Sequence, residues 1–124
     1  MKLRFSHDSI RFRLRKPDVQ ALVGKGRTET SVRIGAGLFR YALELGSLAE
    51  VTAEMAPGGL VVRLPKELVL RWADSQEVGL YSQLSGGTRL LVEKDFACLE
   101  PREGDTNEGT YARPADDAPQ CGAG

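Results

Sequence analysis

Arginines alternate with apolar residues close to the N-terminus, at positions 11, 13 and 15, and Arg4 precedes them by a few residues. In a strand, every second side chain lies on the same face, so Arg11, Arg13 and Arg15 would form a row. Guanidinium groups bind phosphate oxygens and can also read guanine edges. We therefore predict a nucleic-acid-binding surface made of Arg4, Arg11, Arg13 and Arg15. The alternative at this point is the solvated outer face of a half-buried strand.

Two features limit the strength of any contact with DNA. The second hairpin that we expect, over residues 51–60, contains Glu54 but no Lys or Arg, and the sequence pI is about 6.6. A strongly basic domain is the usual footprint of a DNA-binding protein. We therefore expect DNA binding to be one-sided, weak and strongly dependent on salt. The alternative function is a protein-interaction module, antitoxin-like or an adaptor, that does not bind DNA.

Two short polar motifs have simpler interpretations than catalysis. Ser6, His7 and Asp8 are the residue types of a hydrolase triad, but sequence neighbours point apart and cannot form that relay, so we expect a polar turn. The segment 24–28, GKGRT, is similar to a phosphate-binding loop but does not match its spacing, and it follows a helical segment instead of preceding one. We interpret it as the end of a helix.

The cysteines and the single histidine do not suggest a metal. Cys98, Cys121 and His7 lack the paired spacing of metal ligands, and two cysteines are too few for a disulfide framework. We expect reduced thiols, no metal, no cofactor and no catalytic residue, and therefore a non-enzymatic protein. The sequence also lacks a run of about 18 apolar residues, so we expect no membrane span and a cytoplasmic location.

Charge is distributed unevenly along a chain with no net charge. Residues 1–27 contain eight bases and two acids, whereas residues 98–124 contain two bases and six acids. From position 101 onward the composition shifts to Asp, Glu, Gly, Pro, Asn and Thr. Such a segment buries too little apolar surface to offset its ordering entropy, so we expect a disordered or loosely docked acidic tail over 101–124. Asp105, Glu108, Asp116 and Asp117 could then mask the basic hairpin.

The elements that position these residues occur twice. Each half predicts a strand, a turn, a strand, a helix and two more strands, with alternating apolar residues in the strands and a proline at the start of each helix. Residues 9–19 align with 59–69, and Phe39–Glu44 aligns with Thr88–Glu93. We thus predict one mainly β (α+β) domain over 1–100, with ββαββ halves at about 1–48 and 49–100. It is expected to be a monomer or to associate weakly.

Neither half alone is long enough to bury both its sheet and its helix, so we expect the halves to cover each other in a closed or nearly closed barrel.

The matching positions of Glu44 and Glu93, and of Arg40 and Arg89, suggest a repeated cross-strand ion pair at the seam, with a polar binding pocket as the alternative. Trp72 shares one helical face with Leu68 and Val69, which predicts a core position.

The second half carries a family resemblance. Gly59–Leu68, GLVVRLPKEL, followed by Glu77–Leu80, EVGL, resembles the AbrB/MazE-like swapped-hairpin family. The first half keeps Arg13 and Leu14 but displaces the proline to position 17. The resemblance implies a fused pseudo-dimer of two ββαββ units, in a family whose members are usually homodimers and commonly bind DNA through paired N-terminal hairpins. Residues 91–99, LVEKDFACL, also resemble a segment of small uncharacterised bacterial proteins, for which no activity is implied.

Overall fold

The computed structural model describes residues 1–95 and 110–111, and these form a mainly β structure with two short helices. The elements follow the expected ββαββ order twice. They are β1 (Lys2–Phe5), β2 (Ser9–Leu14), α1 (Lys16–Lys25), β3 (Arg27–Ile34), β4 (Gly37–Gly46), β5 (Thr52–Ala56), β6 (Gly59–Pro65), α2 (Lys66–Ala73), β7 (Gly79–Gln83) and β8 (Arg89–Lys94).

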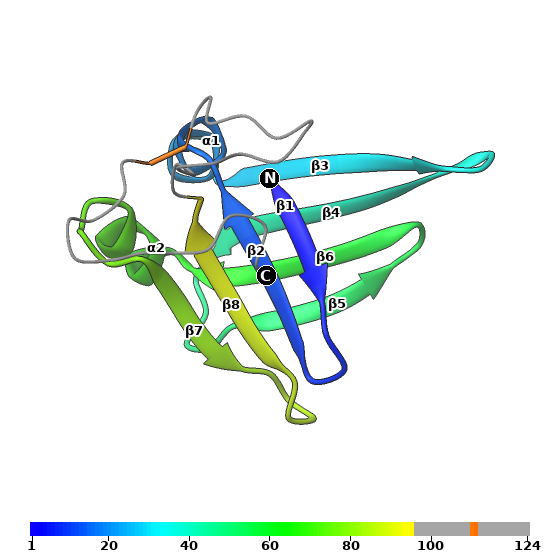
Figure 1. The fold of residues 1–124 in the computed structure, drawn as a ribbon. Coiled ribbons are helices and arrows are strands. Elements are labelled where there is room, and N and C mark those ends of the chain that lie inside the picture. The colour runs from blue at the N-terminus through cyan, green and yellow to red at the C-terminus, as the bar shows by residue number, and fades with distance from the viewer. Residues whose placement is uncertain (96–109, 112–124) are drawn as a thin grey trace.

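The strands form two four-stranded sheets, and each sheet takes one hairpin from each half of the chain (Figure 1). The strand order is β1-β2-β8-β7 in the first, which we call sheet A, and β3-β4-β6-β5 in the second, sheet B. The outer pairs are antiparallel hairpins, while the central pairs, β2 with β8 and β4 with β6, are parallel. Because parallel neighbours cannot be joined by a tight turn, the central pairs must come from distant parts of the chain.

The two sheets use the same register at their central pairs. Ser9 lies opposite Arg89 in sheet A, and Gly59, fifty positions after Ser9, lies opposite Arg40 in sheet B. The order of buried, half-buried and exposed positions is also identical over residues 11–20 and 61–70. The repeated sequence pattern therefore corresponds to a repeated local environment as well as to a repeated order of elements.

The core lies between the inward faces of the two sheets and is completed by the helices. Its largest fully buried side chains are Phe12, Leu14, Leu22, Leu43, Val62, Leu64, Val69, Trp72, Leu90 and Val92. The expected core position of Trp72 is therefore confirmed. At roughly 25 cal/mol per Å² of apolar surface, burial of these side chains is the main favourable term in folding.

The sheets pack face to face without a hydrogen-bonded closure between them. Among the described strands, β1 and β7 are the edges of sheet A and β3 and β5 are the edges of sheet B, so the pairing of edges that a fully closed barrel requires is not present. Apolar packing of the inward faces holds the two sheets together without further strand pairing, because each sheet offers a continuous row of buried residues.

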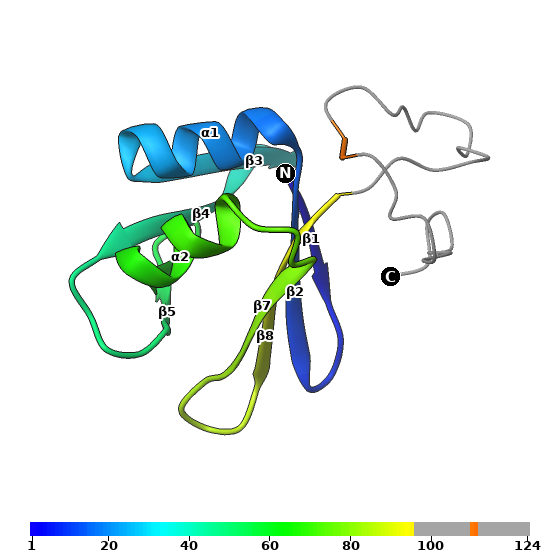
Figure 2. The same ribbon diagram turned by 90° about the vertical axis from the view of Figure 1, so that its left-hand side faces the viewer.

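Local sequence sets both helix ends of α1. Pro17 fits the first turn, where no intrahelical N–H is needed, and the Arg15 N–H donates to Asp18 Oδ2 at 2.9 Å. Gly26 follows the last helical residue with φ +77°, a left-handed conformation that favours glycine. The interpretation of the GKGRT segment as a helix end is therefore confirmed. Figure 2 shows α1 and α2 together at one end of the sheets.

The hairpin of β3 and β4 is the longest among the described strands and projects beyond sheet A (Figure 1). Val32 and Ile34 alternate as half-buried strand residues do, yet they are 45% and 64% exposed. Their pattern is correct for the inward face, but no opposing strand covers that face near the tip.

Among the described residues, no helix is long and apolar enough to cross a membrane.

The described part of the acidic segment is Thr110 and Tyr111. The Tyr111 N–H donates to the Asp95 carbonyl oxygen at 2.8 Å. Asp105, Glu108, Asp116 and Asp117, which we considered as a mask for the basic hairpin, lie outside the described residues, as do Cys98 and Cys121.

Candidate nucleic-acid interface

The arginines that the sequence singled out come together on the outward face of sheet A. Arg4 on β1 lies directly opposite Arg11 on β2, and Lys2 lies opposite Arg13. Directly opposed residues of an antiparallel pair share a face, so strand pairing places these cations side by side. Arg15 continues the same alternation just beyond β2. This group of Lys2, Arg4, Arg11, Arg13 and Arg15 is called the basic face below.

Acidic residues from the end of β8 neutralise part of the basic face. Arg11 Nε lies 3.2 Å from Glu93 Oε1, and Asp95 Oδ2 lies 3.3 Å from Lys2 Nζ and 3.8 Å from Arg15 Nε. Arg4 forms no ion pair with residues 1–95 or 110–111 and is exposed. Among the cations of the basic face, Arg4 is therefore the one most available to an external phosphate, because it lies on β1 at the free edge of sheet A.

On the β8–β7 half of sheet A, the same outward face carries acidic, basic and aromatic groups. Arg89 Nη2 lies 3.3 Å from Asp8 Oδ2, and the Tyr81 hydroxyl donates to Glu93 Oε2 at 3.3 Å. Desolvation of the Tyr81 hydroxyl, together with the Glu93 charge, raises the pKa of Tyr81, so the phenol stays protonated at neutral pH. An exposed aromatic ring beside a row of arginines is an arrangement that can stack on a base.

The outward face of sheet B carries three carboxylates among its four arginines. Arg63 Nε lies 3.2 Å from Glu44 Oε1 and its Nη1 lies 2.9 Å from Glu54 Oε2, while Arg27 also pairs with Glu44. Both Glu44 and Glu93 thus form the cross-strand ion pairs expected at the seams, but with Arg63 and Arg11. Arg40 and Arg89 were the wrong partners, because four residues along a strand separate them from these carboxylates by about 13 Å.

The polar turn between β1 and β2 contains no relay of catalytic side chains. His7 Nδ1 lies 3.9 Å from Asp8 Oδ1, and both residues face solvent at the hairpin tip. Within residues 1–95 and 110–111, no group of three or more His, Cys, Asp or Glu side chains could hold a metal ion. Ser6 uses its backbone N–H in the turn, donating to the Ser9 carbonyl oxygen at 2.9 Å.

A buried lysine is the polar feature that the sequence analysis missed. Lys94 on β8 donates from Nζ to the Ser75 carbonyl oxygen at 2.6 Å, and the same ammonium lies 5.5 Å from the ring centres of both Trp72 and Tyr111. Burial lowers the pKa of Lys94 because the charged form is desolvated, although the Glu77 charge opposes this effect. The ammonium links β8, α2 and the described part of the C-terminal segment.

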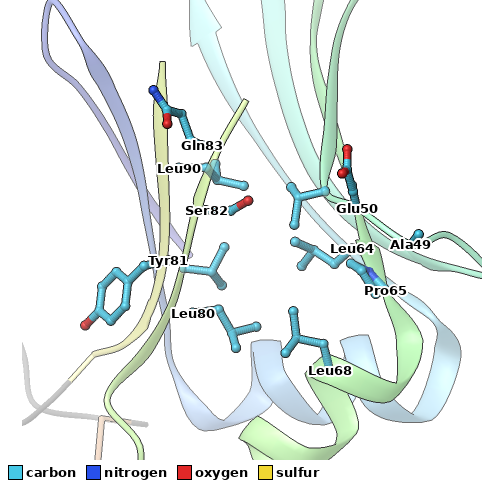
Figure 3. Close-up of a pocket in the computed structure, with 12 residues that line it drawn as sticks. Ala49, Glu50, Leu64, Pro65, Leu68, Leu80, Tyr81, Ser82, Gln83 and Leu90 are labelled. Carbon is cyan, nitrogen blue, oxygen red and sulfur yellow. The ribbon is translucent and has the colours of Figure 1, made fainter. Parts of the chain in front are cut away.

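An apolar pocket of about 330 Å³ opens between the edge of sheet A and the segment before β5 (Figure 3). Leu64, Leu68 and Leu80 point into it, whereas the Tyr81 ring points away toward the outward face. Glu50, Ser82 and Gln83 supply its polar lining. Glu50 is the single carboxylate in its lining, and the Tyr81 hydroxyl points away, so the pocket offers shape for an apolar group but no acid–base pair.

These features define a small α+β protein with two four-stranded sheets and a basic face on one of them. The chain belongs to the family of unknown function DUF7009, which residues 1–115 match. No curated protein and no solved structure matches the chain.

Proposed function

We propose that this chain is a non-enzymatic protein that contacts nucleic acid through the basic face of sheet A. The observation that carries the proposal is the asymmetry between the two outward faces. Strand pairing aligns Lys2, Arg4, Arg11 and Arg13 on one sheet, whereas the equivalent positions of the other sheet are occupied by Thr52, Glu54, Val61 and Arg63. Such a surface binds phosphates on one side of the molecule, and its affinity decreases steeply as salt increases.

The proposed fold class is the AbrB/MazE-like swapped-hairpin arrangement within one polypeptide. The shared register of Ser9 with Arg89 and of Gly59 with Arg40 supports it, because two copies of one unit would pair in this way. Members of that family commonly bind DNA through paired N-terminal hairpins. In this chain only the β1–β2 hairpin is basic, so the expected contact covers one hairpin and is weak.

Binding of fluorescently labelled short duplex and single-stranded oligonucleotides, measured by anisotropy, tests this function. Between about 50 and about 200 mM salt the affinity should fall steeply. Arg4→Ala should weaken binding and reduce the salt slope by about one, since one phosphate contact is lost. The matched control is Arg40→Ala, which removes the same charge from the outward face of sheet B. Equal effects of the two substitutions, or no binding at low salt, would exclude the proposed face.

A protein-interaction module is the second candidate, favoured by a different observation. Val32, Ile34 and Leu38 are large apolar side chains that stand exposed on the projecting β3–β4 hairpin. Exposed apolar side chains grouped on one element are typical of interaction sites. A partner held by this hairpin would remain bound after Arg4→Ala, which separates the second candidate from the first.

A further inference from the structure

We propose that two copies of this chain associate by pairing the free edges of their β3 strands antiparallel. With eight residues, β3 is the longest of the four edge strands in the described structure; β1 has four residues, and β5 and β7 have five each. A long edge strand presents unpaired N–H and C=O groups and is a ready template for another strand. This association is independent of nucleic-acid binding.

The register shows which backbone groups of β3 are free. The Leu45 N–H donates to the Gly26 carbonyl oxygen at 2.9 Å, and the next pair along the hairpin is Arg27 with Glu44. In an antiparallel ladder, residues alternate between bonding to the neighbour and pointing away from it. Even-numbered residues of β3 therefore bond to β4, while Glu29, Ser31 and Arg33 direct their N–H and C=O groups to the open edge.

The open edge is accessible over this part of the strand. Figure 1 shows α1 only near the start of β3, and the rest of the hairpin stands clear of the other elements. Arg33 forms no ion pair with the residues that the structure describes. Glu29 has one exposed contact, at 3.4 Å from Arg27, and an exposed pair of this kind contributes little free energy.

The charges on β3 select a second copy of the chain as the occupant. When two strands pair about a two-fold axis at Ser31, Glu29 lies opposite Arg33 of the second copy, and by symmetry the same ion pair forms again. On the inward face, Thr30 then lies opposite Val32, which gains a cross-strand apolar contact. The strand is thus complementary to itself in charge.

Other registers are less favourable. An axis at Thr30 places Arg27 opposite Arg33, and an axis at Arg33 places two arginines opposite each other. Like charges directly opposed on neighbouring strands are destabilising. An axis at Val32 places Glu29 opposite Gly35, at the turn, and forms no ion pair. An axis at Thr28 would pair Arg27 with Glu29, but it lies near the start of β3, where α1 packs. The arrangement about Ser31 therefore satisfies backbone and side-chain groups on the part of the edge that stands clear.

Sedimentation velocity over a concentration series tests the association. The full chain should show a reversible monomer–dimer equilibrium, and Ser31→Pro should weaken it more than tenfold, because proline removes an edge N–H and obstructs the incoming strand. The β3–β4 ladder should persist, since the Ser31 N–H does not bond to β4. An unchanged circular dichroism spectrum verifies folding. A wild-type chain that stays monomeric at several hundred micromolar, roughly the weak end of specific association, would overturn the proposal.

Charge reversal tests the register without altering the backbone. Glu29→Arg and Arg33→Glu should each weaken association about tenfold, because each places like charges opposite one another twice. A mixture of the two variants should restore it, since each heterodimer again pairs opposite charges at both positions. Arg71→Glu, on the exposed face of α2, is the matched control and should leave the equilibrium unchanged. A dimer that persists in Ser31→Pro, or no recovery in the mixture, would contradict pairing through β3.

Discussion

Arg11 on β2 and Glu93 on β8 form an ion pair across the parallel seam of sheet A, with Nε 3.2 Å from Oε1. Glu44 occupies the equivalent position in sheet B and pairs with Arg63 at the same distance. The same carboxylate position therefore has two roles. In sheet B it pairs with two arginines on a face that carries two further carboxylates, and in sheet A it partly neutralises an otherwise basic surface.

Removing the Glu93 charge should strengthen nucleic-acid binding. In Glu93→Gln, Arg11 loses its ionic partner and one repulsive charge leaves the face that would meet phosphates. We expect about a threefold increase in affinity at low salt, which corresponds to the modest free energy of a partly exposed ion pair. Anisotropy measurements with the same oligonucleotides test this expectation.

The duplication provides the control for this substitution. Glu44→Gln makes the identical chemical change at the equivalent position of sheet B, where the remaining Glu29 and Glu54 still oppose an anionic partner. Its affinity should match that of the wild-type chain. A similar increase in both variants would show that overall charge, and not the basic face, controls binding.

Gly59 should tolerate no side chain, because β4 passes close to it. Gly59 lies opposite Arg40 in the parallel pair, and a Cβ atom at position 59 would overlap the Arg40 carbonyl oxygen. We expect Gly59→Ala to lower the free energy of unfolding by about 2 kcal/mol or more, measured by urea denaturation. Gly24→Ala is the control. Nothing lies near a Cβ at that helical position, so this variant should gain about 0.5–1 kcal/mol.

Stability should depend on pH through Lys94. Because burial lowers its folded-state pKa below the ordinary value of 10.5, the unfolded chain binds more protons between the two values, and stability rises with pH over that interval. Lys94→Met lacks this contribution. As the pH rises from neutral toward that ordinary value, the wild-type chain should therefore gain stability relative to the variant in urea unfolding. Parallel profiles for the two proteins would show that Lys94 does not titrate in this interval.

Local sequence patterns predicted most of the secondary structure. The ββαββ order, a helix end within residues 24–28 and the buried side of α2 all follow from periodicity, proline and glycine within a few neighbouring residues. The exposure of Val32 and Ile34 was not predictable in this way. Their alternation is that of any half-buried strand, and only the length of the opposing sheet decides whether the inward face is covered.

The candidate site shows the same division. Alternation indicated that Arg11 and Arg13 share a face, and Arg4 was predicted to join them. The structure adds the register, which places Arg4 opposite Arg11 and Lys2 opposite Arg13. Which carboxylates approach the basic face depends on β8, about eighty residues further along the chain, so the pairing of Arg11 with Glu93 could not be read from spacing. Lys94 was missed for a related reason. An alternating strand pattern does not reveal that a lysine has aromatic rings on α2 and at Tyr111 to cover it.

The two repeated units and their strand faces follow from local sequence, because they depend on the side-chain periods of strands and helices, and the concentration of arginine in the first hairpin is read directly from the residues. The packed fold, in contrast, sets which hairpins share a sheet, which charges meet across the parallel seams and which edges remain open. Those outcomes depend on contacts between residues far apart in the chain, where packing of the common core, and not local preference, selects the partner.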